Sequence, residues 1–290
     1  MNDTTRAVIA MQDYIEAHLN EPITLVQLAR AAGYSPYHAA HLFSSALGIS
    51  PLRYIRRLRL SQAAQAIRDQ DEAILQIAFD FQFDSHEGFT KAFAKQFGMS
   101  PREYRRNTPA IALFRPYRLL TRKEESTVMK NNTVFVQLVQ RPRRKAVILR
   151  GRKADEYFAY CEEVGCDVWG VLCSIKEALN EPMGMWLPEK LIKPGTSSYV
   201  QGVEVPMDYQ KPLPEGYEFL ELEPCTYMVF QGEPYDDANF ENEIVTIQES
   251  IQRYHPESVG YRFDDTDAPM YQLEPRGERG YIEARPVTKI

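Results

Sequence analysis

The first third of the chain places hydrophobic residues at the spacing of short amphipathic helices. Between residues 25 and 32 they recur at i, i+3 and i+7, and Thr24 stands in the position of an N-terminal cap. Gly33 then supplies a turn, and Ser35 caps a second helix whose first residue is a proline. Two short helices joined by a tight turn predict a helix-turn-helix unit.

The same order of elements returns with an offset of 50 residues, measured from Gly48 to Gly98. The segment G-I-S-P-L-R-Y at the first glycine is matched by G-M-S-P-R-E-Y at the second. Helices are therefore expected near residues 73–81 and 85–97, and a long helix over 51–68 joins the two units. Only two copies are present, which favours a duplicated helix-turn-helix over a solenoid. The buried side of the joining helix is expected to contain Leu52, Ile55, Leu58, Ala63 and Ile67.

Charge divides the chain into a basic part and an acidic part. Up to Lys123 there are 16 Lys and Arg residues against 11 Asp and Glu residues, and the remainder has 18 against 29. Arginines, which can neutralise DNA phosphates, gather in the joining helix and after the second unit. They are Arg53, Arg56, Arg57, Arg59, Arg102, Arg105 and Arg106. A helical bundle with ordinary surface charge is the alternative interpretation.

Composition limits the class of protein. A length of 290 residues suits two domains, and no apolar run approaches the roughly 18–20 residues that span a bilayer. The first residues do not resemble a signal peptide, so we expect a cytoplasmic protein with no membrane partner. The spacing of the four cysteines favours buried free thiols over a metal site, and no cofactor is indicated. These cysteines are Cys161, Cys166, Cys173 and Cys225.

Residues 6–106 resemble the AraC/XylS family of transcription regulators. The resemblance rests on I-T-L-V-Q-L-A-R-A-A-G-Y-S-P, on G-I-S-P-L-R-Y-I-R-R-L-R-L and on I-L-Q-I-A-F-D-F-Q-F-D-S-H-E-G-F-T-K-A-F-A-K-Q-F-G-M-S-P-R-E-Y-R. The DNA-binding domain comes first here, as in Rob-type members. The resemblance implies an all-α domain over residues 1–110 that binds double-stranded DNA and regulates transcription, as an activator or a repressor, with RNA polymerase as a further expected partner.

The resemblance also implies which residues contact DNA, because the N-terminal part of each recognition helix enters the major groove. Two such helices in one chain can occupy adjacent grooves, about 34 Å apart, without dimerisation. The expected contacts are Ser35, Tyr37, His38, Ala40, His41, Ser85, His86, Glu87, Thr90, Lys91 and Lys95. Gln82 replaces the glycine that relatives usually have in the second turn. At a positive φ this residue would cost on the order of 1 kcal/mol relative to glycine.

After residue 132 the pattern alternates in the manner of β-strands. Residues 111–131 are expected to form a linker, and the basic segment 141–145 a solvated hairpin turn. Helices are expected within 154–180 and 238–254. Strands are expected near 133–139, 146–149, 199–205, 217–222, 226–230, 270–273 and 281–287. This order predicts a multidomain protein whose second domain, of class α+β, has two similar modules and an antiparallel sheet.

Residues 132–290 resemble the GyrI-like effector-binding domain. The resemblance rests on L-P-E-G-Y-E-F-L-E-L-E-P-C-T-Y-M-V-F-Q-G-E, on Y-H-P-E-S-V-G-Y and on A-P-M-Y-Q-L-E-P. It implies a small hydrophobic effector, often a cation in multidrug-binding relatives, held in a cleft between the modules. An aromatic wall and one acid suit such a ligand. The candidates are Trp169, Trp186, Tyr199, Tyr227, Phe230 and Glu283. Gln272, which is neutral, lies near the position of the family's usual acid.

Two other functions fit the second domain and stay open at this point. Some GyrI-like domains hydrolyse small electrophilic compounds. This part of the chain has only His255, lacks a G-x-S-x-G elbow and shows no nucleophile–base pair. We therefore assign no catalytic residue and expect a protein that is not an enzyme. In the third reading, the regulator is constitutive and its second domain binds another protein.

Overall fold

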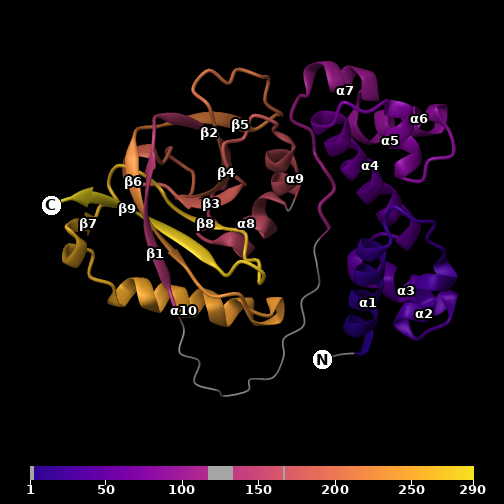
Figure 1. The fold of residues 1–290 in the computed structure, drawn as a ribbon, viewed down its shortest axis with the longest axis horizontal. Helices are drawn as coiled ribbons and strands as arrows, with labels where there is room; N and C mark the ends of the chain where they lie inside the picture. Colours follow the sequence, from indigo (N-terminus) through magenta and orange to yellow (C-terminus); the bar gives the residue numbers. More distant parts are fainter. Residues whose placement is uncertain (1–2, 117–132, 166) are drawn as a thin grey trace. The chain divides into compact units, whose positions relative to one another are not determined.

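The computed structural model describes residues 3–116, 133–165 and 167–290, and the chain divides into two compact units (Figure 1). The first unit covers Met1–Arg122 and the second covers Lys123–Ile290. The predicted architecture, a helical domain followed by an α+β domain with an antiparallel sheet, is confirmed. Among the described helices, none combines the length and the apolar character that crossing a bilayer requires.

Seven helices make up the described part of the first unit, and each predicted helix is present. They are α1 (Asp3–Ala17), α2 (Leu25–Ala32), α3 (Pro36–Leu47), α4 (Pro51–Asp69), α5 (Ile74–Asp80), α6 (His86–Phe97) and α7 (Pro101–Asn107). Helices α2 and α3 form one helix-turn-helix unit, and α5 and α6 form the other. Capping boxes at Thr24 and Ser100 begin α2 and α7, each satisfying backbone N–H groups that the helix leaves unpaired.

The turns after α2 and α5 have the same backbone geometry. The N–H of Gly33 donates to the carbonyl of Arg30, and the next N–H donates back to Ala29. The N–H of Gln82 donates in the same way to Phe79, three residues back, and the following N–H donates five residues back. Both turn residues adopt left-handed backbone angles, with φ of 74° at Gly33 and 61° at Gln82. Gln82 therefore has the positive φ at which it costs free energy relative to glycine.

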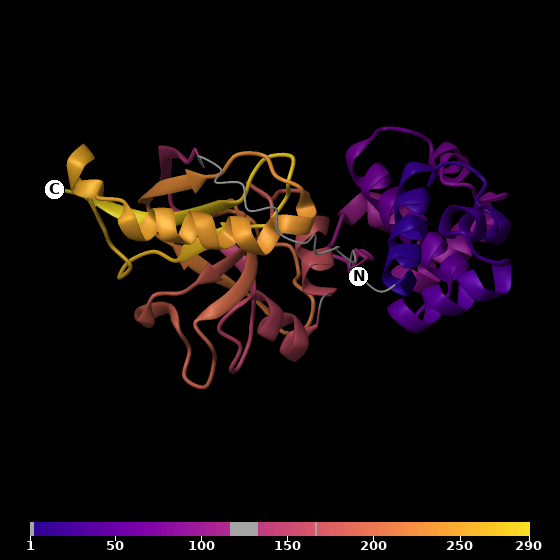
Figure 2. The ribbon, with the colours of Figure 1, turned by 90° about the horizontal axis from the view of Figure 1, so that it is seen from below.

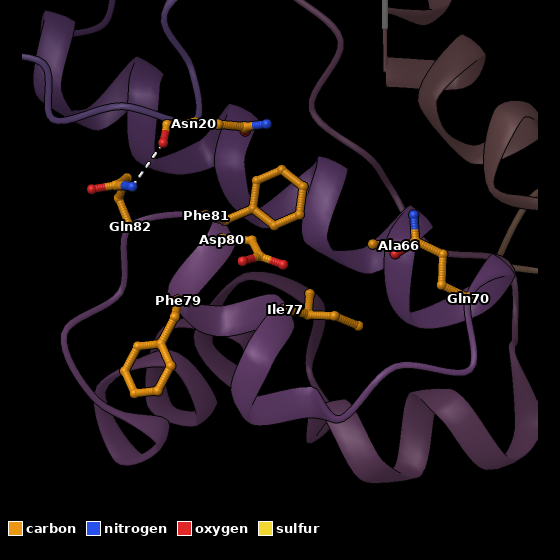
Figure 3. A pocket seen from close by; sticks show the side chains of 8 residues that line it. All are labelled: Asn20, Ala66, Gln70, Ile77, Phe79, Asp80, Phe81 and Gln82. Carbon is orange, nitrogen blue, oxygen red and sulfur yellow. Dashed lines mark hydrogen bonds between the residues drawn. The ribbon is translucent and has the colours of Figure 1, made fainter.

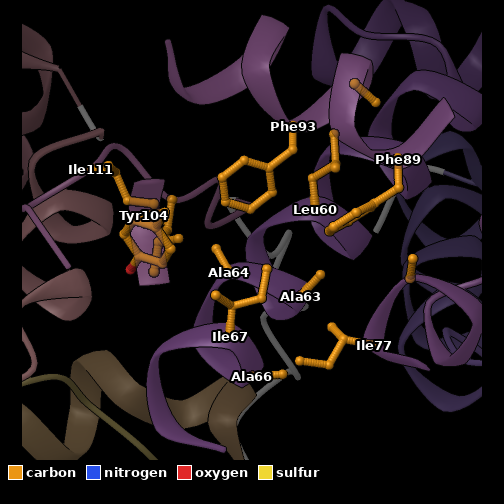
Figure 4. Close-up of a cluster of buried hydrophobic side chains, with 13 residues drawn as sticks. Leu60, Ala63, Ala64, Ala66, Ile67, Ile77, Phe89, Phe93, Tyr104 and Ile111 are labelled. Atoms are coloured by element: carbon orange, nitrogen blue, oxygen red, sulfur yellow. The ribbon is translucent and has the colours of Figure 1, made fainter. Parts of the chain in front are cut away.

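Two hydrophobic clusters, one for each helix-turn-helix unit, lie along α4. Phe43 is buried in the first cluster, and its repeat partner Phe93 is buried in the second (Figure 4). The predicted buried side of α4 holds except at Leu52, which is 57% exposed. Leu52 lies off the stripe that Tyr54, Ile55 and Leu58 turn toward the first cluster, so its side chain meets solvent instead.

Residues 111–114 belong to the first unit, and the predicted start of the linker at residue 111 is wrong. Ile111 and Leu113 are buried in the second hydrophobic cluster, and Phe114 packs against the first. The Phe114 N–H also donates to Ser61 Oγ at 2.7 Å. Its ring lies 5.3 Å from that of Tyr54 and under the Arg57 guanidinium. The apolar residues of this segment therefore strap both clusters to α4. Residues 117–131 of the predicted linker lie outside the described residues.

The second unit is a nine-stranded antiparallel sheet with helices on one face (Figure 2). The strands are β1 (Phe135–Arg141), β2 (Arg144–Arg150), β3 (Met183–Trp186), β4 (Tyr199–Val205), β5 (Tyr217–Leu222), β6 (Cys225–Gln231), β7 (Tyr261–Phe263), β8 (Met270–Leu273) and β9 (Ile282–Lys289). Helices α8 (Tyr157–Val164) and α9 (Asp167–Ser174) pack on β4, whereas α10 (Phe240–Arg253) packs on β6 and β9. Strands β3 and β7 were not predicted.

The sheet has two similar halves that meet at the β3–β8 pair. The strand order is β1-β6-β9-β8 in one half and β3-β4-β2-β5 in the other, with β7 attached to β9. Strands β1 and β5 are exchanged between the two parts of the sequence, because β1 joins β6 of the later part and β5 joins β2 of the earlier part. The predicted hairpin at 141–145 is therefore wrong, because β1 pairs with β6 whereas β2 pairs with β4 and β5.

The basic residues of the 141–145 segment are not all solvated either. Arg144 is 1% exposed, and its Nε donates to Glu204, a residue that is also 1% exposed, at 2.6 Å. Arg141 donates to the other carboxylate oxygen at 2.9 Å, as does Asn180 Nδ2. The Arg144 guanidinium also reaches the carbonyls of Pro142 and Glu223. Such an arrangement satisfies a buried charge that would otherwise be very costly.

Candidate nucleic-acid interface and effector site

The outer face of α3 carries the residues predicted to contact DNA in the first unit. Ser35 Oγ accepts from the backbone N–H of His38, so this serine caps the helix. Tyr37 is 86% exposed, and His38 and His41 are also exposed. The His38 ring lies 4.9 Å from that of Tyr34, whereas Ala40 is half-buried. The helix thus presents aromatic and imidazole groups to solvent.

Helix α6 presents the equivalent face of the second helix-turn-helix. Ser85 Oγ accepts from the N–H of Gly88 at 3.1 Å and caps the helix. The predicted contacts His86, Glu87, Lys91 and Lys95 are exposed, and Thr90 is half-buried. This face differs from that of α3, because it carries two lysines and one carboxylate in place of the tyrosine and one histidine.

The inner faces of the same two helices explain their orientation. Ala39 and Phe43 on α3 are buried, and Phe89 and Phe93 are buried on α6. Because a glycine in left-handed conformation ends each helix, the chain turns back into the core at Gly48 and again fifty residues later. Each predicted reading face is therefore the exposed side of a helix whose opposite side is anchored.

The predicted phosphate-binding arginines divide into two groups. Arg53, Arg56, Arg102 and Arg106 are exposed. Arg57 instead lies over the Phe114 ring at 4.3 Å, and Arg59 donates to the carbonyls of Leu19 and Glu21. Arg105 is half-buried. Sequence could not separate the groups, because the difference depends on contacts with distant segments.

The helix-covered face of the sheet in the second unit gathers several aromatic rings. Trp186 and Tyr199 lie 5.1 Å apart, and Tyr160 approaches the tyrosine at 5.5 Å. Trp169 is buried on α9, 6.3 Å from Tyr157. A further pair at 6.3 Å, Phe158 and Phe240, joins α8 to the start of α10. The predicted residues Trp169, Trp186 and Tyr199 thus share one face with four aromatic residues that sequence reasoning missed.

A row of polar side chains crosses the strands on this face. Gln201 pairs with Gly184, which pairs with Gln272, which pairs with Glu283. Directly paired residues in neighbouring strands point to the same side, and Tyr281 adds a hydroxyl that donates to Gln272 at 2.8 Å. A side chain at Gly184 would overlap the Tyr199 hydroxyl. Glycine there leaves room for the tyrosine ring.

Glu283, the predicted acid, is 4% exposed. Burial raises the pKa of its carboxyl, and the charge of Arg285 opposes that shift. The Arg285 Nε lies 3.4 Å from one carboxylate oxygen, and the Tyr281 hydroxyl lies 3.4 Å from the other. Gln272 is its direct cross-strand partner. The acid and the neutral glutamine that stands at the family's usual acid position are therefore neighbours.

Two predicted ligand residues do not join this face as a common wall. Tyr227 belongs to the cluster on the opposite face, where its hydroxyl donates to the Pro269 carbonyl at 2.9 Å. Phe230 points to the helix-covered side but is fully buried with Ile247 and Ile251 of α10. The prediction of one wall from both residues is wrong, because an interval of three along a strand reverses the face.

The described residues include no group of three His, Cys, Asp or Glu side chains placed to hold a metal ion. Cys161, Cys173 and Cys225 form no disulfide with one another, and each is half-buried rather than fully buried as predicted. Cys166 lies outside the described residues.

The chain is similar to known proteins over its first part. A family model described as a helix-turn-helix domain matches residues 28–107. The right origin-binding protein of Escherichia coli K12 is 37% identical over 131 residues, which are 44% of this chain and 45% of that protein. The chain thus spans less than half the length of this relative. The transposon Tn10 TetD protein of Escherichia coli is 38% identical over 94 residues, which are 32% of this chain and 68% of that protein.

Solved structures also match. A crystal structure of a transcriptional regulator with an AraC-type DNA-binding domain, from Chromobacterium violaceum, is 28% identical in sequence. The match covers 35% of this chain and 91% of that one, with a TM-score of 0.34.

Proposed function

Starting from the fact that this chain belongs to the AraC-type helix-turn-helix family, we propose that it is a transcription regulator that reads duplex DNA with α3 and α6. The observation that carries the proposal is the pair of equivalent helices, each capped by a serine and each exposed on the side opposite its buried phenylalanine. Such a regulator would act in the cytoplasm, through its affinity for DNA or through contact with RNA polymerase.

The chemistry of the two faces supports unequal reading. Lys91 can donate to guanine and Glu87 can accept from a cytosine amino group, whereas Tyr37 offers one hydroxyl and an apolar ring. The exposed arginines Arg53, Arg56, Arg102 and Arg106 supply the phosphate contacts that dominate affinity. Base discrimination should therefore be stronger at the half-site read by α6.

The test is selection of duplexes from a randomised pool by the full chain, followed by binding at increasing salt. We expect a defined sequence and an affinity that falls steeply as salt rises. The double variant His86→Ala, Lys91→Ala should lose about 1–3 kcal/mol of binding free energy per lost base contact. The control Lys289→Ala removes an exposed lysine from the second unit and should bind normally. Failure to enrich any sequence would overturn the proposal.

For the second unit, we propose a small aromatic effector as the ligand of the helix-covered face. The rings of Trp169, Trp186 and Tyr199 supply apolar surface beside the polar row that ends at Glu283. Pockets of this composition, mostly aromatic with a few placed polar groups, suit small molecules. Arg285 offsets the charge of Glu283, so a neutral aromatic compound fits the row as well as a lipophilic cation does.

Thermal unfolding with a panel of lipophilic cations, neutral aromatics and anions tests this second proposal. A ligand at 100 times its Kd adds about 2.7 kcal/mol to the free energy of unfolding, which is readily measured. The variant Trp186→Ala should lose the shift, and Phe219→Ala, which removes an exposed ring from the edge strand β5, should keep it. A panel without any shift would instead favour a protein-binding domain.

A further inference from the structure

The second helix-turn-helix unit has an unexpected residue at its turn. Gln82 occupies the position that Gly33 holds in the first helix-turn-helix, since both turns make the same pair of backbone hydrogen bonds. Both positions are left-handed, a conformation that glycine adopts without strain and glutamine does not. An added side chain at Gly33 would meet nothing within 4 Å. The first helix-turn-helix thus shows that this turn accepts glycine. The presence of a glutamine in the second turn therefore needs another explanation.

Within the first unit, the Gln82 side chain reaches from the second helix-turn-helix to the loop that precedes the first. Its Nε2 donates to the backbone carbonyl of Asn20 at 2.7 Å, between residues 62 positions apart in the chain (Figure 3). Asn20 lies in the loop between α1 and α2. Arg59 of the joining helix donates to the carbonyls on either side, Leu19 at 2.9 Å and Glu21 at 2.5 Å. Three successive backbone carbonyls of this loop therefore accept hydrogen bonds from side chains of α4 and of the turn after α5.

The bond spans an open groove. A cavity of about 500 Å³ lies between the loop at Asn20, the end of α4 at Ala66 and Gln70, and the end of α5 (Figure 3). Side chains do not fill this space, so packing there does not fix the distance between the two helix-turn-helix units. The Gln82–Asn20 bond connects the two rims directly.

We infer that Gln82 is a positioning residue that sets the placement of α6 relative to α3. This inference rests on the proposed reading of DNA by both helices. Helix α6 begins only a few residues after Gln82, so a tether at the turn restrains the start of the second reading helix. A restraint of this kind lowers the entropy that a two-site contact must lose on binding. It should also make affinity depend on the spacing between the two half-sites.

The experiment uses the full chain and a duplex that the wild-type chain selects from a randomised pool. Three related duplexes carry one inserted base pair between the half-sites, one deleted base pair, or a scrambled second half-site. Gln82→Gly removes the tether and leaves a residue that suits the left-handed turn. Gln70→Ala alters a second glutamine that lines the same groove and serves as the matched control.

We expect Gln82→Gly to bind the selected duplex about two- to tenfold more weakly, the usual worth of one hydrogen bond. It should discriminate less against the altered spacings, bind the half-site duplex like the wild type, and keep its melting temperature. Equal affinity and equal spacing dependence in both chains would overturn the inference. So would an equal loss on the half-site duplex, since that would place the effect in the turn itself. If the wild-type chain selects no sequence, the proposed function fails instead.

Discussion

Each unit of this chain contains two similar parts, but the similarity is visible in the sequence of the first unit and in the strand order of the second. In the first unit the repeat is visible in sequence, because each copy needs the same cap, glycine and proline at the same helix ends. In the second unit the repeat is visible in strand order, where β1 and β5 exchange between halves. A helix end demands a particular residue, whereas a strand demands only alternation. Sequence therefore reports one duplication much better than the other.

The comparison extends to where each unit places its chemistry. Helices α3 and α6 expose their candidate residues on one side and bury a phenylalanine on the other. The second unit instead buries its polar groups, in the row that ends at Glu283 and around Glu204 on the opposite face. Substitutions of the exposed candidate residues on α3 and α6 should therefore affect binding, whereas substitutions of the buried polar groups in the second unit should affect stability.

The variant Glu204→Ala should have the largest effect on stability and therefore gives the strongest test of this contrast. It leaves the buried Arg144 without its carboxylate, and breaking one partner of a buried pair typically costs about 3–5 kcal/mol. Chemical unfolding monitored by tryptophan fluorescence should show the loss, because Trp169 and Trp186 both lie in the second unit. Glu221→Ala removes an exposed partner of Arg143 and should change stability by less than about 1 kcal/mol. Similar effects from both variants would contradict a buried network.

Gly184→Ala should have the next largest effect. The added methyl group would overlap the Tyr199 hydroxyl, and overpacking of this kind costs about 1–3 kcal/mol. A double-mutant cycle with Tyr199→Phe sharpens the test, since loss of the hydroxyl should recover part of that free energy. Additive effects of the two substitutions would show that the tyrosine does not cover Gly184.

The two capping boxes allow a matched comparison within the first unit. Thr24→Ala and Ser100→Ala each remove a side chain that accepts from the third residue of a helix, at a cost of about 0.5–2 kcal/mol. Helical circular dichroism during urea unfolding measures both. Ser45→Ala, an exposed site within α3, should leave stability nearly unchanged. Caps that prove neutral would mean that packing on α4 alone fixes these helices.

Glu283→Gln gives the smallest and most pH-dependent effect. Folding raises the pKa of this carboxyl above its ordinary 4.5, so the protonated acid is favoured in the folded state. Its contribution to stability is fully present below pH 4.5 and is lost as pH rises through the folded-state pKa. The variant should therefore melt higher than wild type at neutral pH, with a difference that shrinks as pH falls. Glu257→Gln, at an exposed site, should show no such trend.

The same contrast explains which elements of the fold could be predicted from the sequence. Five helices, α2 to α6, were predicted to within a few residues, because caps and turn residues mark their ends. The long strands of the second unit were found, but their partners were not, since alternation does not specify register with a distant strand. The 141–145 hairpin failed for that reason.

The candidate sites show the same limit. Sequence placed the exposed residues of α3 and α6 correctly on helices, and their contacts with DNA stay a prediction. It could not show that Arg59 holds the α1–α2 loop, or that Tyr227 and Phe230 face opposite sides of the sheet. Those facts depend on contacts between segments far apart in the chain, which no local pattern encodes.

The strand exchange between the halves of the sheet also sets an order of events during synthesis. The contacts of α2 with α3, and of α5 with α6, join neighbouring segments, and such local contacts form fast. Strand β1, by contrast, must wait for β6, because Phe135 pairs with Gln231. Until the ribosome has released β6, strand β1 has no partner among the described strands. We therefore expect the first unit to be folded on the nascent chain while the second still exposes an open edge.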